Sequence, residues 1–89
     1  MSTQVKLRII RFPEVRNRVS LSKSNIFLKI EQKIFPTPVS LGDRAIGWPE
    51  HEIESVVAAI IGKASDKYLI ELVESLRLKR NEICEGSIS

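Results

Sequence analysis

The sequence predicts a small, mostly α-helical α+β domain, and three features of the chain indicate it. The chain has 89 residues, 43% of them apolar and 28% charged, which is typical of a single globular domain. Apolar residues recur at helical spacing in four segments. Between the second and third of these segments, two short apolar stretches flank a Gly-Asp pair and predict a β-hairpin. Two helices followed by a hairpin form the outline of a winged helix-turn-helix.

The N-terminal part of the chain predicts a short strand and a short helix. Apolar residues at positions 5, 7 and 9 alternate with polar ones, which favours a half-buried strand over residues 7–10. Pro13 suits the first turn of a helix, and Glu14 complements the positive end of the helix dipole. We therefore expect a first helix over residues 13–18, with Val15 and Val19 turned inward.

A second helix is expected over residues 23–33. Ser22 is a good N-cap, because its hydroxyl can accept a hydrogen bond from a free backbone N–H of the first turn. The apolar residues cluster in one stripe and are expected in the core; they are Ile26, Phe27, Ile30 and Ile34. The opposite face presents Asn25, Leu28, Lys29 and Gln32, with Ser24 at its margin.

The predicted hairpin follows a segment that cannot remain helical. Each proline of the segment 35–38 removes a backbone donor and favours an extended conformation in the residue before it. Strands are expected over residues 39–41 and 45–48, joined through Gly42-Asp43 in a type II′ turn. Phe35 and Trp48 are expected to hold the hairpin against the helices, and not to stack on bases.

Two further helices are predicted in the C-terminal half. The third begins at Pro49-Glu50 and ends near Gly62, with a buried stripe of Ile53, Val56, Val57, Ile60 and Ile61. The last helix runs from residue 65 or 66 to residue 81. The expected organisation is a winged helix-turn-helix unit over 1–64 with its core at 8–61, a C-terminal helix over 65–82 that packs on this unit or self-associates, and a disordered tail over 83–89.

Charge is distributed unevenly along the chain. The net charge is +3, but residues 1–48 contain nine Lys or Arg and three Asp or Glu, whereas residues 49–89 contain five and eight. A basic half joined to an acidic half indicates one face for a polyanion and another for a different partner. No apolar run is long enough to cross a bilayer, the N-terminus does not resemble a secretory signal, and the single cysteine is Cys84. These features predict a cytoplasmic protein with no membrane association.

Groups that could support catalysis are sparse in the sequence. The single histidine, His51, lies at a helix start with Glu52 and Glu54, where acidic and polar side chains are more simply surface residues. No Cys or His cluster has metal-ligand spacing, and neither a phosphate-binding loop nor a Ser-His-acid set is indicated. The sequence therefore predicts a protein that is not an enzyme, with no catalytic residue, cofactor or metal.

Four short blocks of sequence, taken together in their order and spacing, resemble the AlpA-type prophage regulators, which are relatives of the excisionases. The blocks are Arg11–Val15, Leu21–Phe27, Phe35–Gly42 and Arg44–Trp48, and the resemblance covers roughly residues 8–61. It implies a winged helix-turn-helix of the MerR and excisionase type, whose second helix enters the major groove while the hairpin contacts the adjacent backbone or minor groove. It also implies a transcriptional regulator or an excisionase (recombination directionality factor), or both, of a prophage or genomic island.

The chain departs from the family pattern at several positions. Phe27 and Leu28 stand where the family usually has tyrosine and then arginine, so a contact expected at position 28 is missing, and Lys29 is the nearest replacement. Lys33 stands in place of the usual glycine that ends the second helix, and Ser40 in place of a basic residue on the first hairpin strand. These departures bear on the DNA target and leave the fold unchanged.

The 23–33 helix supplies candidate contacts in the major groove. Lys23 lies in the first turn, where free backbone N–H groups already attract phosphate. Asn25 projects outward near the same end, and an asparagine amide can bond both N6 and N7 of adenine. Lys29 and Gln32 lie further along this face and are expected to meet phosphate or water.

Basic side chains outside this helix complete the candidate interface. Arg44, beside the hairpin turn, is long enough to enter or follow the minor groove. Arg16 and Arg18, with Arg11 ahead of them, would clamp the DNA backbone beside the groove. The expected DNA-binding residues are Arg11, Arg16, Lys23, Ser24, Asn25, Leu28, Lys29 and Arg44.

Two classes of partner are compatible with these features. The first is double-stranded DNA, at an attachment site or an integrase promoter, with integrase and self-association on DNA as additional contacts. The alternative is a protein-interaction module that binds a recombinase or a response regulator through its acidic C-terminal half.

Overall fold

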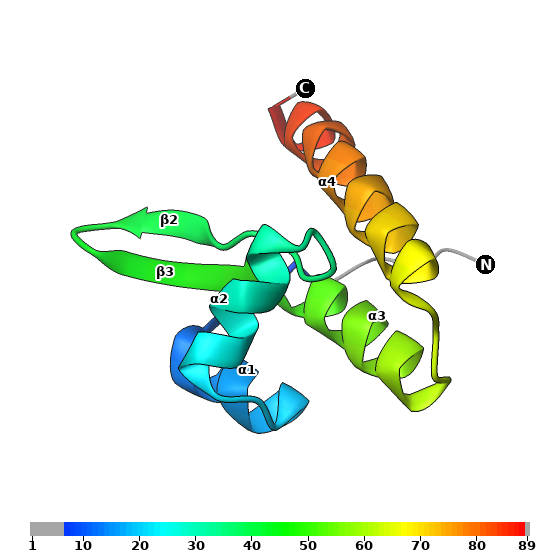
Figure 1. The fold of residues 1–89 in the computed structure, drawn as a ribbon. Helices are drawn as coiled ribbons and strands as arrows, with labels where there is room; N and C mark the ends of the chain where they lie inside the picture. The colour runs from blue at the N-terminus through cyan, green and yellow to red at the C-terminus, as the bar shows by residue number, and fades with distance from the viewer. Residues whose placement is uncertain (1–6, 89) are drawn as a thin grey trace.

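The computed structural model describes residues 7–88, the last four by their backbone alone, and confirms a mostly helical α+β fold of the winged helix-turn-helix type (Figure 1). Its strands form one antiparallel sheet in the order β1-β3-β2. The elements are β1 (Ile9–Arg11), α1 (Phe12–Val19), α2 (Lys23–Glu31), β2 (Val39–Gly42), β3 (Ala45–Pro49), α3 (Glu50–Ile61) and α4 (Asp66–Ile88).

Helices α1 and α2 are bounded by the local signals that the sequence contains. Pro13 lies in the first turn of α1, and Ser20 ends the helix in the left-handed region with φ 57°. The Ser22 hydroxyl accepts a hydrogen bond from the backbone N–H of Asn25 at 3.2 Å, which confirms the predicted N-cap of α2. Helix α2 ends at Glu31, two residues before the predicted end, because Lys33 takes a left-handed φ of 64° that a helix cannot continue.

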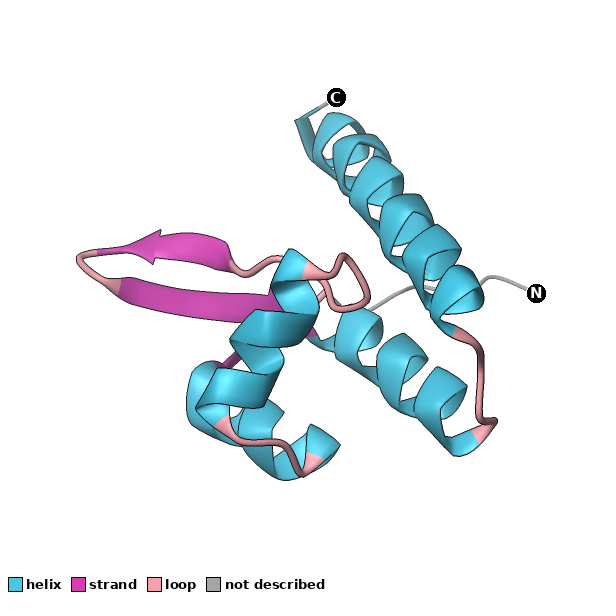
Figure 2. Ribbon diagram, in the orientation of Figure 1, coloured by secondary structure: helices cyan, strands magenta, loops and turns pink. Residues whose placement is uncertain are grey.

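The hairpin of β2 and β3 is the wing, and Figure 2 shows its two strands extending beyond the helices. The pairs Ser40↔Ile46 and Gly42↔Ala45 leave one extra residue, Leu41, on β2 as a bulge. The two-residue loop is Asp43–Arg44, with φ 32° and 66°. Two left-handed central residues are typical of a type I′ turn. The predicted turn was therefore wrong in two respects: it was placed one residue too early, at Gly42-Asp43, and it was assigned to type II′.

Gly47 is the point on β3 where the sheet leaves no room for a side chain. A Cβ atom built there would lie 2.6 Å from Cγ2 of Ile9 and 2.9 Å from the carbonyl oxygen of Ile10. The Gly47→Ala variant is therefore expected to lower the free energy of unfolding by about 1–3 kcal/mol, since β1 must move away from β3. Urea unfolding followed by circular dichroism measures this difference.

The matched control for this prediction is Gly62→Ala. At Gly62 the nearest atom to a built Cβ is the carbonyl oxygen of Ala58 at 3.5 Å, so alanine is expected to be neutral or slightly stabilising. Equal stabilities of the two variants would show that β1 and β3 are not in contact at Gly47.

One core cluster joins the sheet to the helices. Trp48 is fully buried, donates a hydrogen bond from Nε1 to the carbonyl oxygen of Pro36 at 2.8 Å, and packs edge to face on Phe35 with ring centroids 6.1 Å apart. The prediction that both aromatic residues lie in the core is confirmed. The cluster contains Ile10, Val15, Ile26, Phe35, Trp48, Ile53 and Val56. Because α2 contributes Ile26 and the wing contributes Trp48, this cluster sets the position of the wing relative to α2.

Three residues assigned to the core by their spacing lie at the surface. Phe27 is 36% exposed, and its ring packs against the ring of Phe12 in a tilted arrangement, with centroids 5.8 Å apart. Ile60 and Ile61 are 45% and 76% exposed, because α3 continues past the core cluster, whose last fully buried member on this helix is Val56. Helical periodicity identifies a face, but it does not show how far along the helix the face is covered.

Helix α4 packs on the rest of the domain through Leu69 and Leu76. It continues to Ile88, so residues 83–88 are helical where a disordered tail was expected over 83–89, and residue 89 lies outside the described residues. Arg80 donates two hydrogen bonds to the carboxylate of Glu52, at 2.8 and 2.6 Å, and a third to the carbonyl oxygen of Thr37 at 2.7 Å. Glu52 is fully buried, so its assignment to the surface was wrong.

Candidate nucleic-acid interface

Helix α2 turns its apolar side to the core and its polar side to solvent. Ile26 is fully buried on the inner side. Of the residues predicted for the outer face, Lys29 is half-buried and the others are exposed: Lys23, Ser24, Asn25, Leu28 and Gln32. The Ser22 cap uses the backbone N–H of Asn25 and leaves the Asn25 side chain free of that bond. The helix therefore presents a capped N-terminus, a lysine and an amide side by side in one turn.

The wing presents a second exposed segment. Residues 40–44 are exposed, and Arg44 lies at the second position of the turn. Figure 1 shows the wing projecting away from α3 and α4, so its tip stands clear of the acidic C-terminal half. Arg44 is therefore well placed to reach a partner beyond the body of the domain.

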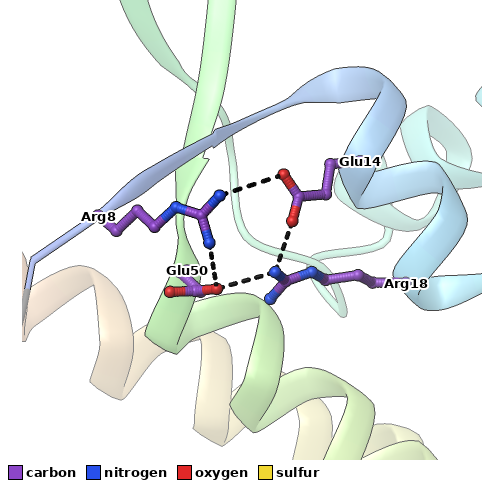
Figure 3. A network of polar contacts seen from close by, with 4 residues as sticks. All are labelled: Arg8, Glu14, Arg18 and Glu50. Atoms are coloured by element: carbon purple, nitrogen blue, oxygen red, sulfur yellow. Dashed lines mark hydrogen bonds and ion pairs between the residues drawn. The ribbon is translucent and has the colours of Figure 1, made fainter.

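Four charged residues near α1 form a closed network (Figure 3). Arg18 contacts Glu14 at 2.5 Å and Glu50 at 2.8 Å, and Arg8 contacts Glu50 at 3.1 Å and Glu14 at 3.7 Å. The hydrogen bonds to Glu50 and then to Glu14 raise the pKa of Arg18 above its ordinary value. Arg18 thus joins α1 to α3, and its expected role in clamping the DNA backbone stays a prediction.

The other basic residues predicted for the interface have no carboxylate partner among the described side chains. Within residues 7–84, no ion pair involves any of the five cations Arg11, Arg16, Lys23, Lys29 and Arg44. They come from the end of β1, from the last turn of α1, from α2 and from the wing. Arg8, Arg18 and Arg80 thus form ion pairs that join elements of the fold, whereas these five cations are available to meet an anion outside the chain.

Sequence reasoning missed the network of Figure 3, although half of it leaves a local signal. Glu14 and Arg18 are four residues apart on one helix, the spacing at which side chains meet. The partnership with Glu50 leaves no such signal, because it depends on the packing of α1 against α3.

Two kinds of site are absent from the described residues. No group of three or more His, Cys, Asp or Glu side chains within residues 7–88 could hold a metal ion. None of the helices in this range is both long and apolar enough to cross a membrane. The exposed basic residues of α1, α2 and the wing are groups that could contact an anion.

The family model for the prophage CP4-57 regulatory protein (AlpA) matches residues 8–59. The chain belongs to the AlpA family. It is also 37% identical over 54 residues to the uncharacterized protein ORF88 of Enterobacteria phage P4. That match covers 61% of each chain, so the AlpA-family chain spans about three fifths of this curated relative. No solved structure matches the AlpA-family chain.

The AlpA match divides the fold in a way that bears on function. It contains the sheet, α1, α2 and most of α3, and all eight predicted contact residues lie inside it. Helix α4 lies beyond the match, although Arg80 ties it to α3. The AlpA match therefore contains all five of the cations predicted to contact DNA that lack a described ion pair.

Proposed function

We propose that this AlpA-family protein binds double-stranded DNA in a sequence-specific manner and performs no catalysis. In this proposal α2 enters the major groove, and the wing lies along the neighbouring backbone or minor groove. The observation that carries it is the set of five cations without ion pairs, gathered on α1, α2 and the wing, next to exposed side chains of α2. Cations of this kind release counterions from DNA and supply most of the affinity that does not depend on sequence.

The first turn of α2 is the proposed base-reading element. Lys23 and the free N–H groups of this turn bind a phosphate, which places Ser24 and Asn25 at the edges of the bases. Asn25 reads an adenine through N6 and N7. Leu28 is 50% exposed on the same helix, and an apolar side chain at this position suits a thymine methyl group. Lys29, half-buried, reaches a phosphate at the flank.

Arg44, Arg11 and Arg16 are the proposed backbone contacts. Arg44 extends from the wing tip into or along the minor groove. Arg11, the N-cap of α1, and Arg16, in its last turn, are both exposed and approach the backbone beside α2. Such contacts fix the position of the protein on DNA, while the bases are read by α2.

The proposed biological role is that of an AlpA-like regulator of an integrated element, acting at an integrase promoter, at an attachment site as an excisionase, or at both. The membership in a prophage regulatory family supports it. Footprinting on the promoter and attachment site of a neighbouring integrase gene distinguishes these roles, since protection of the attachment site alone favours excision and protection of the promoter alone favours transcription control. Protection at neither site would exclude both.

Asn25→Ala is expected to reduce discrimination at one base pair by about 1–3 kcal/mol and to leave preferences at the other positions unchanged. The substitution keeps the Ser22 cap, because the cap uses the backbone N–H of residue 25. Binding to a set of single-base-pair variants of the footprinted site, measured by fluorescence anisotropy, checks this. An unchanged ranking of the sites would exclude Asn25 as a reader of bases.

A protein partner for the outer face of α4 is a second candidate function. Ile70 and Leu78 are exposed there among the acidic residues Glu71, Glu74 and Glu82, and this helix lies outside the AlpA match. A recombinase or response regulator would be the partner. Removal of residues 65–89 is a poor test, because it would also take Arg80 from the buried Glu52. Ile70→Asp is the cleaner variant, with loss of partner recruitment at unchanged DNA affinity as the supporting result.

A further inference from the structure

An apolar groove runs between α3 and α4, in the part of the molecule where the helices turn back on each other. Its volume is about 570 Å³. Small side chains of α3 form one wall, and larger residues of α4 form the other; the lining is Ser55, Ala58, Ala59, Gly62, Ala64, Tyr68 and Leu72. Beside it, Ile61 is 76% exposed and Tyr68 52% exposed. Ile60, 45% exposed, adjoins Ile61, and a contiguous exposed apolar patch is a candidate interaction surface.

This surface is separate from the proposed DNA interface. Figure 1 places the loop between α3 and α4 and the tip of the wing at opposite ends of the molecule. The groove itself is lined by uncharged residues. Two exposed charged residues stand just outside it, Glu54 and Lys63, and neither has an ion-pair partner in the part of the chain that the structure describes.

The order of these residues along α3 is self-complementary. Glu54, Ala58 and Ile61 follow one another at helical spacing on one face, and Ala58 lies midway between Glu54 and Gly62. If two α3 helices crossed in opposite directions at Ala58, Glu54 of one copy would lie opposite Gly62 and Lys63 of the other. By the same symmetry, Ile61 of one copy would lie over Ser55 of the other, at the edge of the groove.

We propose that a second copy of this chain occupies this surface, with the two α3 helices antiparallel about a two-fold axis at Ala58. The small side chains at the crossing allow the helices to approach closely. Ile61 of each copy then fills the groove of the other, and two Glu54–Lys63 pairs form at the rim. A two-fold interface of this kind uses the same patch on both partners. Glu54 lies four residues before Ala58 and Lys63 five residues after it, just past the end of α3, so the acidic residue of each copy comes near the basic residue of the other.

The dimer has a consequence that rests on the proposed function. A two-fold axis at Ala58 would relate two copies of the α2 and wing surface, and the preferred DNA target would then be an inverted repeat. The association itself takes place without DNA, so it can be tested separately.

Sedimentation of the full-length chain without DNA is the first test. The wild type is expected to sediment as a dimer, and Ile61→Asp as a monomer, since two carboxylates would be placed in the apolar contact. Leu78→Asp, which alters a side chain 50% exposed on the outer face of α4, is the matched control and is expected to remain dimeric. A wild type that stays monomeric at every concentration, or an Ile61→Asp variant that stays dimeric, overturns the proposal.

Charge reversal tests the antiparallel arrangement. Glu54→Lys and Lys63→Glu are each expected to weaken the dimer roughly 2- to 25-fold, the range for two exposed ion pairs, and the double variant is expected to restore it. A double variant no better than the single ones excludes this arrangement. Binding of the Ile61→Asp variant to a short duplex with one site is measured in parallel. If this variant binds DNA and the wild type is monomeric, only the dimer is refuted. If neither the wild type nor any variant binds DNA, the proposed function is refuted.

Discussion

Arg80→Met is expected to lower the free energy of unfolding by about 3–5 kcal/mol, which is the usual effect of removing one partner of a buried ion pair. The Glu52 carboxylate is fully buried and receives two hydrogen bonds from Arg80, at 2.8 and 2.6 Å. Methionine can fill much of the space of the arginine stem, but it would leave a buried charge without a partner. Since small domains are stable by about 5–15 kcal/mol, the variant should lose a large part of its stability, which urea unfolding measures.

Two further variants show whether the buried charge is the cause. Arg77→Met, also on α4, removes a guanidinium that pairs with the exposed Glu74 at 2.5 Å, and it is expected to change stability little because solvent screens that pair. Glu52→Leu combined with Arg80→Met removes both charges and is expected to be clearly more stable than Arg80→Met alone. If the double variant is as unstable as the single one, the loss comes from packing and not from the unpaired carboxylate.

The same arginine connects α4 to the proposed DNA-binding surface. Its third hydrogen bond, of 2.7 Å, goes to the carbonyl oxygen of Thr37 in the segment between α2 and the wing. Helix α4 therefore supports the connection between the two elements proposed to contact DNA, although it lies outside the AlpA match. Lysine at position 80 would keep one charge beside Glu52 but could not reproduce the planar set of three bonds.

Local chemistry made much of the fold predictable from the sequence. Ser22 caps α2 because a hydroxyl there meets a free N–H three residues on, and Pro13 starts α1 because its fixed φ suits a first turn. The prolines at 36 and 38 end the helical segment in the same way. These effects act between residues close in sequence, so the elements and their order could be found without knowledge of their packing.

Features that depend on distant residues could not be predicted in this way. Glu52 and Arg80 are 28 residues apart, and Arg18 meets Glu50 only because α1 packs on α3. The sequence therefore predicted a surface position for Glu52 and a DNA contact for Arg18. The outward turn of Asn25, in contrast, follows from the apolar stripe on the other side of α2. Whether Asn25 contacts a base remains a prediction, since spacing identifies a face and not its partner.

The affinity for DNA is expected to fall steeply with salt. If the five unpaired cations Arg11, Arg16, Lys23, Lys29 and Arg44 each neutralise a phosphate, the slope of log K against log salt concentration is about −4.5, from about −0.9 for each contact. Between 50 and 200 mM salt this corresponds to a loss of affinity of roughly 500-fold. Titrations of a labelled duplex at four or five salt concentrations give the slope directly.

A pair of double variants with equal changes of charge tests the position of the interface. Lys23→Ala with Arg44→Ala removes cations from α2 and the wing, and the slope is expected to become shallower by about 1.8. Lys67→Ala with Lys79→Ala removes the same charge from the exposed surface of α4, and its slope should equal that of the wild type. If net charge alone governed binding, the slope of log K against log salt concentration would change equally in both variants. An equal change would therefore mean that binding is non-specific and that α2 and the wing do not form the interface.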